Sequence, residues 1–165
     1  MADYRQLSDL SLMSVGVLHR QWMRADLMRE LADKELNSAP ETPTEDQLFL
    51  RITVEPFGVY MYLWHALLYS VLEGCKERQL DLSFLQSLDD PLYESMRELR
   101  NTVFHTAQGD RYVEDRMFNL MNQPEAARRV LDIHYRIYEL LSNEVERRGL
   151  WSGKEGAWSK RFPRS

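Results

Sequence analysis

The chain has 165 residues, of which 44% are hydrophobic and 28% are charged, and its formal net charge is −5. This composition is typical of a globular protein with a hydrophobic core, and it excludes an intrinsically disordered chain. Cys75 is the only cysteine, so no internal disulfide can form, and no cysteine pattern indicates an oxidising compartment.

The sequence predicts no membrane segment and no signal peptide. The longest apolar run, residues 57–72, contains His65 and is shorter than the roughly 20 residues that a helix needs to span a bilayer. Residues 1–10 lack the basic and then apolar pattern of a signal peptide. We therefore expect a cytoplasmic protein.

In the first half of the chain, apolar residues recur at helical intervals. Residues 8–37 predict a long helix, and residues 37–46, with two prolines and small polar side chains, predict a loop. Thr44 and Gln47 have the spacing of a capping box, which predicts the start of a second helix. Pro56 predicts a kink or a restart of this helix, because proline disfavours helical geometry in the residue before it.

The second half predicts three more helices. Asp90 is suited to an N-cap, and Pro91 then occupies the first helical position of a helix that runs to about residue 105. Residues 113–121 predict a short helix, and residues 124–148 predict the last one. Because no segment alternates at period two, we expect an all-α protein, an up-and-down bundle of four to five main helices.

The C-terminal end differs from the rest of the chain in charge. Residues 147–165 carry six basic residues and one acidic residue, a net charge of +5, so the preceding 146 residues sum to −10. We divide the chain into a helical-bundle domain, residues 1–148, and a basic tail, residues 149–165. The two tryptophans and one phenylalanine of this tail suit it to binding a polyanion by charge and stacking. The alternative is a flexible end whose aromatic side chains pack on the body or on a second subunit.

The segment RNTVFH, residues 100–105, combines three residue types that suit phosphate chemistry. On a helical wheel, Asn101 and His105 fall opposite the apolar stripe that begins at Leu92, and Arg100 flanks them. An imidazole can transfer a proton near neutral pH, and a guanidinium suits a phosphate or its transition state. An amide can hold a phosphate oxygen, a sugar hydroxyl or the imidazole. Together these groups predict metal-free RNA cleavage by attack of the ribose 2′-hydroxyl.

The same six residues resemble the R-x4-6-H motif of the HEPN-domain family, in which a polar residue often follows the arginine. The resemblance matches Arg100 and His105 to the motif and Asn101 to its polar position. It implies a HEPN-like fold and a homodimeric, metal-independent endoribonuclease that leaves a 2′,3′-cyclic phosphate and needs no cofactor. It also implies a toxin or a phage-defence protein that acts alongside a neutralising antitoxin protein.

Three further residues near this segment are predicted to bind the RNA substrate. Arg97 flanks the same helix face, and Arg111 and Tyr112 follow the loop after the motif. Arg111 and Tyr112 could equally be surface residues.

The remaining histidines are predicted to be core residues. Arg128 and Arg129 also stand at motif spacing before His134, but His134 lies in the apolar stripe of the last helix. We expect it to be buried with a hydrogen-bond partner, and we expect His19 and His65 to pack in the core as well.

Cleavage of this kind needs a base for the 2′-hydroxyl and an acid for the departing 5′-oxygen. One chain offers a single histidine on the motif face, so a two-fold dimer would supply the second. We therefore expect a homodimer with residues 97–105 at its axis. Two alternatives stay open: a non-catalytic HEPN-like module that binds a nucleotide, RNA or a protein partner, and a helical interaction module whose arginine and histidine have no chemical role.

Overall fold

The computed structural model describes residues 4–38, 44–85, 91–104 and 113–148. These ranges contain helices and no strand, which confirms the predicted all-α helical bundle. In chain order the helices are α1 (Tyr4–Asn37), α2 (Glu45–Thr53), α3 (Pro56–Glu77), α4 (Pro91–Phe104), α5 (Val113–Met121) and α6 (Ala126–Arg147).

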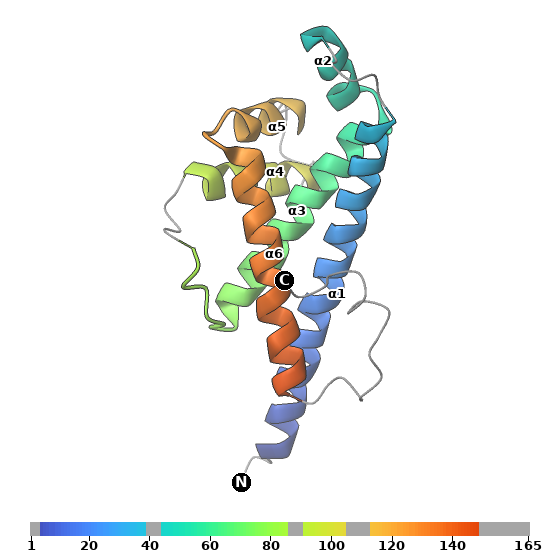
Figure 1. Ribbon diagram of the computed structural model, residues 1–165. Helices are drawn as coiled ribbons and strands as arrows, with labels where there is room; N and C mark the ends of the chain where they lie inside the picture. The colour runs from blue at the N-terminus through green and yellow to red at the C-terminus, as the bar shows by residue number, and fades with distance from the viewer. Residues whose placement is uncertain (1–3, 39–43, 86–90, 105–112, 149–165) are drawn as a thin grey trace.

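The three long helices form the body of the bundle. Figure 1 shows α1 running antiparallel to both α3 and α6, with α2 projecting beyond the end where α1 stops and α3 starts. Helix α4 packs on α3, and α5 packs on α4. The motif helix α4 is therefore supported by α3 on one side and by α5 on another.

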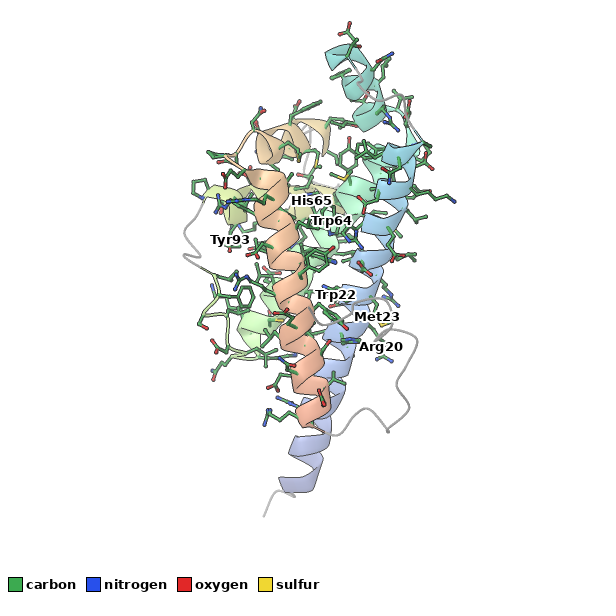
Figure 2. The ribbon with its side chains drawn as sticks, viewed as in Figure 1. Arg20, Trp22, Met23, Trp64, His65 and Tyr93 are labelled. Atoms are coloured by element: carbon green, nitrogen blue, oxygen red, sulfur yellow. The ribbon has the colours of Figure 1, made fainter. Side chains whose placement is uncertain are left out.

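Each long helix turns an apolar stripe toward the other two. Figure 2 shows Trp22, Trp64 and His65 in the interior between α1, α3 and α6. Burial of one large apolar side chain stabilises the fold by about 1.5–3 kcal/mol. Among the buried apolar side chains are Val15, Leu18 and Trp22 of α1, Leu68, Val71 and Leu72 of α3, and Val130, Ile137 and Leu141 of α6.

The predicted starts of the second and third helices are confirmed. The Thr44 hydroxyl accepts a hydrogen bond from the Gln47 amide at 3.3 Å, and the Gln47 side-chain oxygen accepts one from the Thr44 amide at 2.9 Å. Pro56 is the first residue of α3, so the chain restarts there and does not merely kink. The backbone N–H of Val54 closes α2 by bonding the Leu50 carbonyl.

The later boundaries differ slightly from the prediction. Pro91 begins α4 as expected, while its predicted cap Asp90 lies outside the described residues. Helix α6 begins at Ala126 and not at residue 124, because Glu125 has a φ of 53°, which is incompatible with a right-handed helix. The predicted tail, residues 149–165, also lies outside the described ranges.

None of the described helices combines the length and the apolar character that a transmembrane span requires.

The junction of α2 and α3 depends on a close backbone contact. The Ile52 carbonyl, at the end of α2, lies against Gly58 and accepts a hydrogen bond from the Tyr62 hydroxyl one turn further along α3. A Cβ at position 58 would stand 1.9 Å from the Ile52 oxygen. Only glycine leaves room for this carbonyl, so residue 58 fixes how α2 projects from the bundle.

Gly58→Ala should therefore destabilise the protein by about 2 kcal/mol or more, since the obstructing atom is backbone and cannot rotate away. The matched control is Gly16→Ala in α1, where a new Cβ meets no described atom within 4 Å. That change should stabilise the helix by about 0.5–1 kcal/mol. Urea denaturation followed by circular dichroism measures both, and a neutral Gly58→Ala would contradict the close contact.

Candidate functional site

Arg100 lies in the last turns of α4, between α4 and α3. Its Nη2 donates a hydrogen bond to the Glu73 carboxylate of α3, and its Nη1 donates one to Asn101 Oδ1 at 2.8 Å. Its guanidinium carbon lies 5.7 Å from the centre of the Tyr69 ring, within cation–π range. The Arg100 side chain is consequently only 18% exposed. This exposure is lower than the sequence suggests for a residue that flanks a polar helix face.

Two other predicted site residues lie on the outer face of α4. Asn101 and Arg97 are exposed, and Arg97 donates a hydrogen bond to Glu94 on the same helix. The structure thus brings Arg100 and Asn101 into direct contact. The remaining predicted site residues, His105, Arg111 and Tyr112, lie outside the described ranges, although α4 extends to the residue before His105.

Helix α4 is tied to both of its neighbours by ion pairs close to the motif. Glu98, two residues before Arg100, accepts a hydrogen bond from Arg116 of α5. The buried side chains of Leu92, Met96 and Leu99 form the predicted apolar stripe on the opposite face. Packing and charge together therefore fix the orientation of the last turns of α4.

Sequence reasoning missed Tyr69 and Glu73. Both lie on α3, one turn apart, and Glu73 directly follows the apolar run 57–72. Burial and the Glu73 charge raise the pKa of the Tyr69 hydroxyl above its ordinary value. The only signal in the sequence was an acidic residue, Glu73, directly after the apolar run. Nothing in the sequence indicates that Glu73 contacts Arg100.

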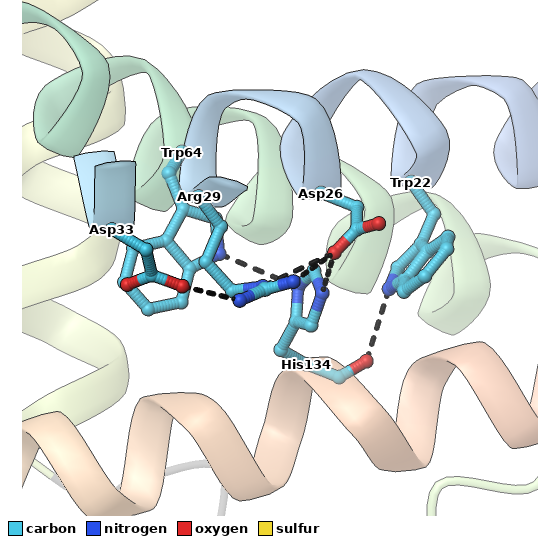
Figure 3. A network of polar contacts seen from close by, with 6 residues as sticks. All are labelled: Trp22, Asp26, Arg29, Asp33, Trp64 and His134. Carbon is cyan, nitrogen blue, oxygen red and sulfur yellow. Dashed lines mark hydrogen bonds and ion pairs between the residues drawn. The ribbon is translucent and has the colours of Figure 1, made fainter. Parts of the chain in front are cut away.

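A second polar group, centred on His134 of α6, lies in the core (Figure 3). Its Nε2 lies 3.1 Å from Asp26 Oδ1 of α1, and its Nδ1 accepts a hydrogen bond from the Trp64 indole at 3.3 Å. An indole N–H can only donate, so Nδ1 carries no proton and the Nε2–H donates to Asp26. His134 is therefore a neutral imidazole between α1 and α3.

Charge in this buried group is balanced by Arg29. It donates two hydrogen bonds to Asp26 Oδ1, at 2.9 and 3.1 Å, and one to Asp33 at 2.6 Å. Burial would raise the pKa of Asp26, but the hydrogen bonds from His134 and Arg29 outweigh it and lower the pKa. Burial lowers the pKa of His134 more than Asp26 raises it. The group thus holds an anionic aspartate, a cationic arginine and a neutral histidine.

This network is structural. His134 and Asp26 are 0% and 1% exposed, so no substrate can reach them. The prediction that His134 is a core histidine with a hydrogen-bond partner is confirmed, and so is the burial of His19 and His65. The core histidines are therefore not a candidate functional site, and the surface of α4 remains the candidate.

No group of three or more histidine, cysteine, aspartate or glutamate side chains in the described ranges could hold a metal ion. Cys75 is buried, and burial raises the pKa of its thiol to about 12.

Comparison with known proteins gives no matching family model, no matching curated protein and no matching solved structure. The resemblance to the HEPN family thus remains a prediction from residues 100–105.

The buried histidines make stability depend on pH. His65 Nδ1 donates to the Met61 carbonyl at 2.7 Å, and burial lowers the pKa of His65 from 6.5 to about 4. Between these two values the unfolded chain binds a proton that the folded chain does not. The stabilisation is therefore complete above about pH 6.5 and is lost as the pH falls toward 4.

We expect the free energy of unfolding to fall by about 3 kcal/mol through His65 alone between pH 7 and pH 4. His65→Leu removes this titration, so its stability should change less steeply across the window. Urea denaturation at pH 7, 6, 5 and 4.5 measures both slopes. Equal slopes for the variant and the wild type would show that His65 is not held in the neutral form.

Proposed function

We propose that this chain is a metal-independent endoribonuclease of HEPN type that acts through Arg100, Asn101 and His105. The observation that best supports the proposal is the hydrogen-bonded pair of Arg100 and Asn101 at the end of α4, within one and a half turns of His105 in sequence. A cation that a neighbouring helix already orients, together with the amide bonded to it, suits the binding of a phosphate oxygen.

In this mechanism His105 removes the proton from the ribose 2′-hydroxyl. The 2′-oxygen bonds to phosphorus, the bond from phosphorus to the 5′-oxygen breaks, and a proton passes to the leaving oxygen. Arg100 stabilises the extra negative charge on the phosphoryl oxygens. Each terminal nitrogen of Arg100 has a second N–H that its bonds to Glu73 and Asn101 do not use. Arg97, Arg111 and Tyr112 would bind the flanking RNA.

The products would be a 2′,3′-cyclic phosphate and a 5′-hydroxyl. Such an enzyme would act in the cytoplasm as a toxin or in phage defence, with an antitoxin protein that neutralises it.

Purified protein should cleave mixed RNA in EDTA and leave cyclic-phosphate ends. His105→Ala should lower the cleavage rate by about 100-fold or more, since it removes the acid–base group, and Arg100→Ala should have a similar effect. The matched control is Arg136→Ala, which breaks an exposed arginine–carboxylate pair on α6. Gel electrophoresis with end-group analysis measures the result. Cleavage that survives His105→Ala would refute the assignment.

We further propose a homodimer in which two α4 faces meet at a two-fold axis, so that one His105 acts as base and its copy as acid. Phe104 supports this arrangement, because this residue of the motif segment is 44% exposed. An exposed aromatic side chain on a polar face is suited to an interface.

Light scattering should report roughly twice the chain mass of 19.6 kDa. Phe104→Asp should reduce the mass to that of a monomer and lower activity, because it places a charge in the proposed contact. The matched control is Val54→Asp, which changes an apolar residue that is more exposed (75%) and lies outside the proposed contact. This variant should stay dimeric. A fully active monomer would refute the composite site.

A second candidate function is a non-catalytic module that binds a nucleotide, RNA or a protein partner. The ion pair between Arg100 and Glu73 favours it, because an arginine that joins two helices can have a purely structural role. Binding of RNA without cleavage in EDTA, unchanged by His105→Ala, would support this alternative over the nuclease.

A further inference from the structure

Glu73 is the acidic residue that contacts Arg100 from another helix. It lies on α3, its side chain is 39% exposed, and it accepts a hydrogen bond from Arg100 Nη2. Resting on the proposed function, we propose that Glu73 is a positioning residue for Arg100. It fixes the guanidinium for cleavage and at the same time weakens the binding of RNA.

The contacts around Arg100 leave one N–H of each terminal nitrogen without a bond to Glu73 or Asn101. Its Nε is buried and has no hydrogen-bond partner among the described residues. The ring of Tyr69 lies near one face of the group, and Glu73 and Asn101 each bind one terminal nitrogen. A phosphate that binds Arg100 would therefore use the terminal nitrogens, each of which already contacts Glu73 or Asn101.

This arrangement has two opposing electrostatic consequences. Glu73 holds a long, flexible side chain in one orientation, which reduces the entropy lost when the transition state forms. Its negative charge also lies within ion-pair distance of the group that has to bind a phosphate, and like charges repel. Removal of the charge should strengthen binding and slow the chemical step, whereas a merely structural residue would not separate the two effects.

The test uses Glu73→Gln, which keeps the shape and removes the charge. Binding is measured by fluorescence anisotropy with 2′-O-methyl RNA, which lacks the attacking hydroxyl and cannot be cleaved. We expect about 3- to 10-fold tighter binding and about tenfold slower single-turnover cleavage of ordinary RNA. The matched control is Glu77→Gln, one turn further along α3, whose exposed carboxylate pairs with Arg78. It removes the same charge and should change neither quantity.

A second variant separates orientation from charge. Tyr69→Leu removes the ring near the guanidinium and leaves Glu73 in place, so cleavage should slow while binding does not tighten. Equal behaviour of Glu73→Gln and Glu77→Gln in both assays would overturn the inference. A wild-type chain that cleaves no RNA would refute the proposed function, and the binding assay would still decide the inference: tighter binding by Glu73→Gln alone supports it, and unchanged binding overturns it.

Discussion

The bundle depends on the hydrogen bonds made by the neutral imidazole of His134. This imidazole joins the three long helices, because it donates to Asp26 of α1, accepts from Trp64 of α3 and belongs to α6. The His134 carbonyl also accepts a hydrogen bond from Trp22 at 3.0 Å. Loss of one partner of a buried charged group typically costs about 3–5 kcal/mol, because the remaining charge has no water to solvate it. We infer that this network fixes the register of the three helices, since a shift along any axis would break several of these bonds.

The position of the candidate site follows from that register. Helix α3 carries both Trp64, which bonds His134, and Glu73, which bonds Arg100. Helix α4 packs on α3 through its apolar stripe and is tied to α5 by Glu98 and Arg116. The core thus positions α3, and α3 in turn positions Arg100. An arginine that is only 18% exposed loses little further freedom when it binds a ligand.

Burial restricts His134 and His65 to a structural role. His134 and His65 are held neutral in the core, where burial lowers their pKa values below the ordinary range. Such groups stabilise the fold above pH 6.5 and cannot exchange protons with a substrate. A proton-transfer role suits a histidine that solvent can reach, so neither His134 nor His65 is the histidine proposed to act on RNA.

The sequence by itself determined the helices and the inner face of several of them. Apolar residues three or four positions apart specify a helix and its inner face, so the sequence assigns His134 and the stripe that begins at Leu92 to the core, where both are buried. Thr44, Pro56 and Pro91 marked helix starts because capping and the fixed φ of proline act within a few residues. Arg100 and Asn101 were identifiable as neighbours for the same local reason.

Only the tertiary structure decided which distant charges meet. Glu73 and Arg100 are 27 residues apart, and Asp26 and His134 are 108 apart. A charge on a helix has many candidate partners, and the pair that forms depends on the packing angle and register of two helices, which no local pattern encodes. The left-handed backbone of Glu125, which sets the start of α6, has no signal in the local sequence. Periodicity therefore revealed the elements, while the contacts that orient Arg100 arose from their assembly.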